Sequence, residues 1–143
     1  MTLPDTMRAA RRIRAGRLET AIQVDSDVPL PELASSLPGE HVLVKVHFTA
    51  LNPIDLKFLD NPIISKFLNT TTPCLDFAGI VVKSSSSRFT TGQAIFGQTQ
   101  PPNFGACAEY VVVGAQHCTK VPEGVELQDA ATIGIAEIGR AHV

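Results

Sequence analysis

The chain has 143 residues, of which 44% are hydrophobic and 18% charged, and its formal net charge is −2 at pH 7. This length suits one domain with a core of its own, and the composition excludes a disordered, collagen-like or coiled-coil chain. No apolar stretch approaches the roughly 20 residues of a membrane-spanning helix, so we expect no membrane insertion. The nearly balanced charge argues against a protein that binds nucleic acid by neutralising phosphates.

The cysteines of the chain are Cys74, Cys107 and Cys118. An odd number without a short C-x-x-C spacing fits neither a disulfide framework nor a zinc knuckle. We therefore expect reduced, buried thiols in a cytoplasmic protein.

The arginine-rich N-terminus has two competing interpretations. A mitochondrial presequence is rich in arginine and serine and poor in acidic residues. Here Asp5 and Glu19 flank the arginines, and no serine occurs between them. We favour a hairpin with strands from Met7 to Arg14 and from Leu18 to Val24, because the intervening Ala-Gly-Arg suits a turn. Mitochondrial import is the alternative.

The clearest element is a strand from His41 to Ala50, in which apolar and polar residues alternate. A period of two with β-branched residues predicts a half-buried strand. The residues expected on its buried face are Val42, Val44, Val46, Phe48 and Ala50.

The pattern changes at Asn52, where a typical helix start follows the strand. Asn is a preferred N-cap, Pro53 suits the first helical position, and the negative charge of Asp55 suits the helix dipole. These residues predict a short helix from Pro53 to about Leu59, and a further helical turn between Ile63 and Leu68.

Short apolar runs separated by Gly- and Pro-containing turns make up the rest of the chain. They predict strands at Phe77 to Lys83, Gln93 to Phe96, Ala106 to Val113 and His117 to Val121, and a final helix from Gln128 to about Ile135. Several short strands with few helices indicate a mainly β fold, either a small barrel or a curled sheet.

The last seven residues, 137–143, do not continue the final helix pattern. Their sequence, Glu-Ile-Gly-Arg-Ala-His-Val, is also the translation of a common sequencing adaptor. We expect the native domain to occupy residues 1–136 and the tail to be a non-native addition. A genuine C-terminus that happens to match is the alternative.

Five blocks of sequence carry a resemblance to a known family. They are Ala50–Asp55 (ALNPID), Pro73–Val81 (PCLDFAGIV), Gly92–Gly97 (GQAIFG), Gly105–Val111 (GACAEYV) and Lys120–Gly124 (KVPEG). In this order they resemble the medium-chain dehydrogenase/reductase superfamily, in its zinc-independent quinone oxidoreductase and enoyl reductase branch. The resemblance implies a GroES-like, partly open β-barrel with short helices, the N-terminal catalytic domain of a two-domain enzyme whose Rossmann domain is missing here.

Other residues fill the zinc-binding positions of that superfamily. Zinc-dependent relatives have a cysteine at the position of Asn52 and a His-Glu pair at Leu75-Asp76. Their four-cysteine lobe corresponds to the segment from Gly97 to Gly105, which contains no cysteine. An amide and a leucine cannot replace a thiolate and an imidazole as ligands, so we expect neither a catalytic nor a structural zinc.

Without a metal, the resemblance implies reduction of quinones, enones or enoyl thioesters, and disfavours alcohol dehydrogenation. The enolate or phenolate formed in such reductions needs only hydrogen-bond donors and a proton source, whereas an alkoxide is better stabilised by a metal. The implied reductant is NADPH, bound mainly by the missing domain, and the implied substrate is a small molecule. A homodimeric parent is compatible with the resemblance. We expect the chain by itself to be inactive and to bind NADPH negligibly.

The resemblance assigns Asn52 to the site as a catalytic residue, and Asn52 with Pro53 as contacts to the cofactor. The residues alone also allow a purely structural role for Asn52, as a helix cap. Asp55 is expected to support the helix and Asp76 to supply hydrogen bonds behind the cleft, and Lys57 is a weaker cleft candidate. The alternative from another class is a non-enzymatic β-barrel module that binds a partner protein.

Overall fold

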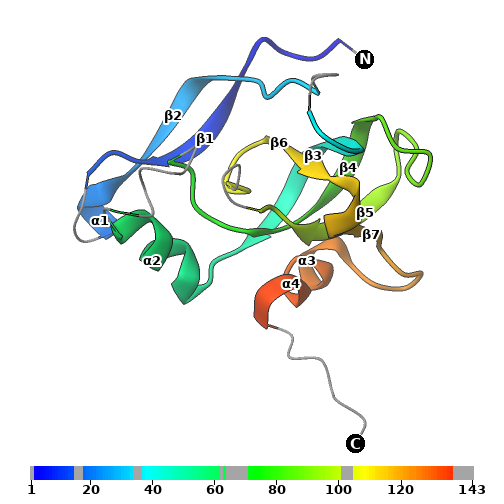
Figure 1. Ribbon diagram of the computed structural model, residues 1–143. Coiled ribbons are helices and arrows are strands. Elements are labelled where there is room, and N and C mark those ends of the chain that lie inside the picture. The colour runs from blue at the N-terminus through cyan, green and yellow to red at the C-terminus, as the bar shows by residue number, and fades with distance from the viewer. Residues whose placement is uncertain are drawn as a thin grey trace, which may run out of the picture.

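The computed structural model describes residues 2–14, 18–33, 37–61, 63, 71–100 and 105–136. In these residues the fold is mainly β, with two sheets and a few short helices (Figure 1). The strands are β1 (Thr6–Arg12), β2 (Ile22–Pro29), β3 (His41–Ala50), β4 (Asp76–Ser84), β5 (Ala94–Gln98), β6 (Tyr110–Gly114) and β7 (Cys118–Lys120). The α-helices are α1 (Leu18–Ala21), α2 (Pro53–Asp60), α3 (Leu127–Ala130) and α4 (Ile133–Ala136).

Strands β1 and β2 form the expected antiparallel hairpin, but the second strand begins later than predicted. Leu18–Ala21, predicted as strand, is the helical turn α1. The ladder starts at the pair Arg12–Ile22, and the Ile13 N–H donates to the Ala21 carbonyl at 2.8 Å. The four residues before Ile22 therefore lie outside the ladder, where Leu, Glu and Ala favour helix. The predicted turn at 15–17 lies outside the described residues.

The other five strands form a sheet in the order β6-β3-β4-β5-β7, in which each neighbouring pair is antiparallel. The predicted bounds of β3 are confirmed, but Phe48 is 43% exposed and does not belong to the buried face. Val46 pairs with Gly79 while Phe48 pairs with Ala78, so β3 has one extra residue at this point. Such a bulge reverses the alternation of faces beyond it.

Beyond β4, the predicted strands are shorter or shifted. The predicted strand Ala106–Val113 becomes a strand only from Tyr110, and residues 106–109 run alongside β1 instead. The Ala10 N–H donates to the Cys107 carbonyl at 2.9 Å, and Ala9 and Ala108 form an isolated bridge. This contact joins the two sheets and curls them into a partly open barrel.

The core lies between the sheet and the segments that close over it. Its side chains come from β3, β4, β5 and β6 and include Val42, Val44, Phe77, Val81, Ile95 and Val111. A second cluster joins Met7 and Ala9 of the hairpin to Leu43 and Tyr110. Because the hairpin covers this side, β3 is buried on both faces in its first half.

The predicted final helix, Gln128 to Ile135, is two short helices rather than one. The backbone N–H and hydroxyl of Thr132 both donate to the Asp129 carbonyl, at 3.1 and 2.8 Å, where α3 ends. The buried residues Ala130 and Ala131 pack with Ala78 of β4, which places α3 and α4 against β4 and β5. None of the helices in the described part of the chain is long and apolar enough to cross a membrane.

Candidate functional site

The start of helix α2 positions Asn52, the residue that the sequence assigned to the site. Asn52 is the N-cap, with an extended backbone (φ −120°, ψ 153°), and its N–H donates to Asp55 Oδ2 at 2.6 Å. The predicted helix start is therefore confirmed. The side-chain nitrogen of Asn52 has a further role, because it donates to Asp76 Oδ2 at 2.9 Å.

Asp76 connects the start of α2 to the last described helix. It is the first residue of β4 and is fully buried. Its Oδ2 accepts from Asn52 and, at 3.2 Å, from the backbone N–H of Ile135 in α4. Its backbone carbonyl accepts from the Thr49 hydroxyl at 2.7 Å. We call Asn52, Asp55 and Asp76 the Asn52 cluster.

Both carboxyl groups of the Asn52 cluster lie in an environment that disfavours their charge. Burial raises the pKa of Asp76, and the hydrogen bonds from Asn52 and Ile135 offset this only in part. Burial also raises the pKa of Asp55, and the charge of Asp76 adds to the increase. Among the described residues, the Oδ1 atoms of both carboxyls have no hydrogen-bond partner. The surroundings of Asn52 therefore include two buried carboxyls whose charged forms are disfavoured by desolvation.

The other predicted site residues lie at the surface beside this cluster. Pro53 and Lys57 are exposed, and Asn52 itself is only 9% exposed. Leu51, which was not a predicted site residue, is 72% exposed. Asn52 therefore presents only a small part of its surface. The further turn predicted between Ile63 and Leu68 lies almost wholly outside the described residues.

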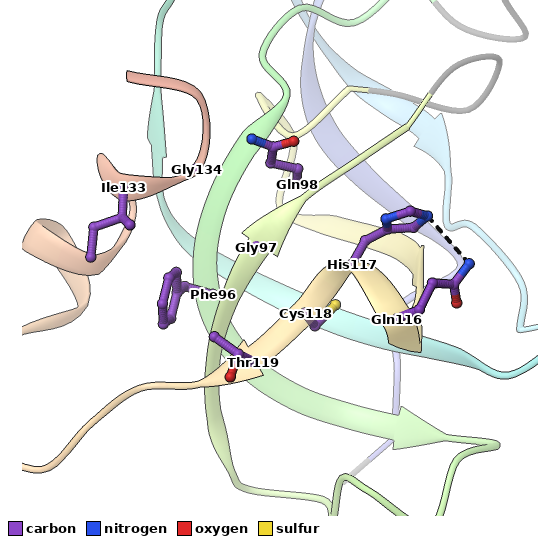
Figure 2. Close-up of a pocket in the computed structure, with 9 residues that line it drawn as sticks. All are labelled: Phe96, Gly97, Gln98, Gln116, His117, Cys118, Thr119, Ile133 and Gly134. Atoms are coloured by element: carbon purple, nitrogen blue, oxygen red, sulfur yellow. Dashed lines mark hydrogen bonds between the residues drawn. The ribbon is translucent and has the colours of Figure 1, made fainter. Parts of the chain in front are cut away.

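A pocket of about 430 Å³ lies between β5, β7 and the start of α4 (Figure 2). Its polar groups include Gln98 and His117, and the His117 imidazole and the Gln116 side-chain nitrogen are 3.2 Å apart. None of the predicted site residues lines it. The full lining is Phe96, Gly97, Gln98, Gln116, His117, Cys118, Thr119, Ile133 and Gly134.

Gly134 separates this pocket from the Asn52 cluster. A Cβ atom at Gly134 would lie 2.2 Å from Asp76 Oδ1, so only glycine lets α4 approach the buried carboxylate so closely. Sequence reasoning missed the pocket because its walls come from three segments that no local pattern brings together. The only signal in the sequence was the glycine inside the final helix pattern.

The residues at the positions that bind zinc in zinc-dependent relatives do not form a recognisable set of metal ligands. In the part of the chain that the structure describes, no three His, Cys, Asp or Glu side chains are grouped so as to hold a metal ion. Leu75, at a ligand position of zinc-dependent relatives, has no side-chain donor atom. The absence of zinc remains a prediction.

Comparison with known proteins identifies the family. Residues 38–123 match the alcohol dehydrogenase GroES-like domain family. The chain is 33% identical over 143 residues to the trans-enoyl reductase pgmF of Aspergillus terreus, which covers 92% of this chain and 40% of that protein. It is 32% identical over 132 residues to the quinone oxidoreductase of Homo sapiens, covering 90% of this chain and 38% of that protein.

The fold is similar to that of solved oxidoreductases. The quinone oxidoreductase from Coxiella burnetii superposes with a TM-score of 0.77 at 26% identity, covering 92% of this chain and 42% of that structure. The chain thus spans about two fifths of the length of these relatives. On the matching residues and the shared fold, it belongs to the alcohol dehydrogenase GroES-like domain family, within the medium-chain dehydrogenase/reductase superfamily.

Proposed function

We propose that this chain is the N-terminal substrate domain of an NAD(P)H-dependent oxidoreductase that reduces quinones, enones or enoyl thioesters without zinc. The observation that carries the proposal is the similarity to trans-enoyl reductases and quinone oxidoreductases along nearly the whole chain. Since the chain spans about two fifths of those relatives, a second domain has to supply most of the nucleotide-binding site.

The residues around Asn52 fit the nicotinamide end of such a cofactor, but they do not provide a site for its phosphates. The exposed ring of Pro53 and side chain of Leu51 offer an apolar surface, and the Asn52 amide lies at its edge. The chain has no G-x-G-x-x-G motif, the usual pyrophosphate site of dinucleotide-binding domains. When bound, NAD(P)H supplies the hydride.

The chain's own contribution to the reaction is the orientation of the Asn52 amide. Asp76 fixes the Asn52 amide through its side-chain nitrogen, and Asp55 fixes the backbone at the same residue. An oriented amide close to a substrate oxygen stabilises the negative charge that develops there during reduction. Burial raises the pKa of both carboxyls behind it.

A titration with NADPH tests whether a second domain is needed to bind the cofactor. We expect NADPH added to the purified 143-residue chain to show no micromolar binding by calorimetry, because the sequence lacks the G-x-G-x-x-G motif that usually binds the phosphates. Micromolar affinity would show that this domain binds the cofactor by itself.

Light scattering on the same sample tests the alternative of a free-standing binding module, which should be monodisperse.

A chimera tests the reaction. Residues 1–136 replace the matching part of pgmF, and oxidation of NADPH is followed with a quinone, an enone and an enoyl thioester. We expect activity on at least one of them, reduced roughly 100-fold by Asn52→Ala, the size of effect seen when one oxyanion donor is lost. Val24→Ala, at a side chain that is 69% exposed, is the control. Zinc-dependent oxidation of an alcohol, without reduction of any of these substrates, would contradict the proposal.

The genomic sequence tests how far the native domain extends. We propose that the native part of this chain ends at residue 136, and that the gene continues from there into the coding sequence of a second domain. Sequencing the genomic locus across codon 136 should reveal a different continuation and a downstream G-x-G-x-x-G motif. A stop codon directly after Val143 would contradict it. Residues 137–143 lie outside the described residues.

A further inference from the structure

Two cysteines that are far apart in the sequence lie side by side in the fold. The segment that contains Cys74 runs next to the segment that contains Cys107, and backbone hydrogen bonds hold them together. The Ala106 N–H donates to the Cys74 carbonyl at 2.7 Å, and the Cys107 N–H donates to the Pro73 carbonyl at 3.1 Å. The two thiols lie close enough for each to shift the pKa of the other. Backbone pairing therefore holds the two cysteines next to each other.

The two thiols differ in how they meet the solvent. Cys74 is fully buried, whereas Cys107 is only partly buried. The third cysteine, Cys118, is buried elsewhere, and its thiol donates to the Gly114 carbonyl at 3.5 Å. A small oxidant can therefore reach Cys107 first, with Cys74 directly behind it.

The backbone at Cys74 adds a second, independent sign that this position is special. Its φ of 73° is left-handed, and among the described residues it is the only non-glycine residue with a positive φ. A side chain other than glycine is rarely kept in this conformation unless the surrounding structure holds it there, and such residues cluster at functional sites.

The exposure of Cys107 and the interaction between the thiols both favour Cys107 as the sulfur that reacts. The neighbouring Cys74 thiol lowers the pKa of Cys107 to about 7, while the interaction with Cys107 and burial raise the pKa of Cys74. The thiolate is the nucleophilic form of cysteine, so Cys107 is the attacking group near neutral pH. The thiol that remains protonated, Cys74, is the resolving partner.

We propose that Cys107 and Cys74 form a redox modification site, in which a peroxide oxidises Cys107 and Cys74 then closes a disulfide. The Cys107 thiolate attacks one oxygen of hydrogen peroxide, the O–O bond breaks, and the departing hydroxide takes up a proton to leave as water. The Cys74 sulfur attacks the resulting sulfenic acid, the S–S bond forms, and the hydroxyl leaves with the Cys74 proton as a second water. Two thiols lose two electrons, and one peroxide is reduced.

The disulfide would connect covalently two parts of the fold that the reduced chain joins by hydrogen bonds and packing. Cys74 lies two residues before Asp76 of the Asn52 cluster, and the Cys107 carbonyl accepts from Ala10 of β1. Oxidation would thus restrain the segment that carries Asp76. This inference is independent of the proposed reductase activity.

Peptide mapping of the oxidised chain tests the site. The folded 143-residue chain is treated with hydrogen peroxide, the excess peroxide is removed with catalase, and the chain is unfolded in urea that contains N-ethylmaleimide, which alkylates free thiols near neutral pH, and then cleaved. Cleavage after Lys83 separates Cys74 from the other two cysteines, and cleavage after Glu109 separates Cys107 from Cys118. We expect a Cys74–Cys107 linked pair, two hydrogens lighter than the two free peptides together, with Cys118 alkylated. Its rate of formation should rise with pH through about 7.

Two variants and one denatured sample serve as controls. Cys118→Ser should form the linked pair as the parent chain does, and Cys74→Ser should leave Cys107 oxidised without a link. Chain oxidised in urea should lose the preference and give bridges that include Cys118. Alkylation of both Cys74 and Cys107 after peroxide, or a native bridge that includes Cys118, would overturn the proposal. The mapping of the parent chain decides this even if a variant fails to fold.

Discussion

Asp76 combines burial with contacts to three separate segments of the chain. It holds the Asn52 side chain, the Ile135 N–H and the Thr49 hydroxyl, yet its Oδ1 has no partner among the described residues. An unpartnered buried carboxylate oxygen costs free energy. The hydrogen bonds that join β3, α2 and α4 at this residue compensate for part of that cost.

Asp76→Asn should change how stability depends on pH. Burial raises the pKa of Asp76 in the folded chain above its unfolded value. The folded chain therefore binds this proton more tightly, and its stability falls as pH rises from the unfolded pKa through the folded one. The variant lacks this loss, so its stability relative to the parent should increase with pH. Urea unfolding at several pH values measures this.

The control for this experiment is Asp129→Asn, at an exposed aspartate. The difference in unfolding free energy between Asp129→Asn and the parent should not increase with pH in the way expected for Asp76→Asn. Parallel stability curves for Asp76→Asn and the parent would show that the folded state does not favour the protonated carboxyl.

Gly134→Ala should destabilise the chain because its new methyl group meets a buried carboxylate. The added Cβ would lie 2.2 Å from Asp76 Oδ1 and 2.9 Å from Cγ of Gln98. Overpacking of this kind costs about 1–3 kcal/mol. Urea unfolding gives the free energy, with Gln128→Ala at an exposed position of α3 as the control. Equal stabilities would mean that α4 can move away from β4 without cost.

At the scale of elements, helix α2 is stabilised unequally at its two ends. Its first turn has a buried carboxylate, Asp55, that accepts the N–H of Asn52. Its last residue, Asp60, forms an ion pair with Arg12 of β1, in which the Asp60 side chain is 56% exposed. Water around the Asp60 carboxylate weakens this pair, although the Arg12 side chain is only 15% exposed, whereas a buried cap is costly to remove.

The two ends of α2 can be compared with the same substitution. Asp55→Ala should cost about 1–2 kcal/mol, because it leaves the N-cap N–H without its acceptor. Asp60→Ala should cost less than Asp55→Ala, because the Asp60 carboxylate is 56% exposed. Denaturant unfolding of both variants gives the comparison, and equal costs would contradict a stabilising role for the capping contact.

At the scale of the whole molecule, stability depends on the core shared by the central strands. Ile95 of β5 is fully buried within it, and Val24 of the hairpin is 69% exposed. Ile95→Ala should therefore cost about 2–5 kcal/mol, because it removes buried methyl groups and leaves a cavity. Val24→Ala should change stability by less than about 0.5 kcal/mol. Thermal or urea unfolding distinguishes them, and similar losses would contradict this assignment of the core.

Zinc content tests the interpretation of the metal positions. We expect elemental analysis of the purified chain to find far less than one zinc per chain, because Asn52 and Leu75 do not supply a thiolate or an imidazole. Zinc that remains stoichiometric after dialysis against a chelator would contradict the proposed zinc-independent chemistry.

The sequence by itself was enough for everything that depends on neighbours along the chain. Alternation predicted β3 with its observed bounds, and the Asn-Pro-x-Asp pattern predicted the start of α2, because both signals act over a few residues. The family followed from short motifs in a fixed order. The same local pattern wrongly predicted Phe48 to lie on the buried face of β3, because alternation along one strand does not reveal a bulge.

Only the tertiary structure decided which distant residues meet. The bulge that exposes Phe48 depends on how β3 pairs with β4, and the neighbourhood of Cys74 and Cys107 depends on a backbone pairing across the fold. Likewise, Asp76 reaches Asn52 and Ile135 only because β4 passes between α2 and α4. Strand register and long-range packing arise from the competition of many contacts at once, and no short stretch of sequence encodes their outcome.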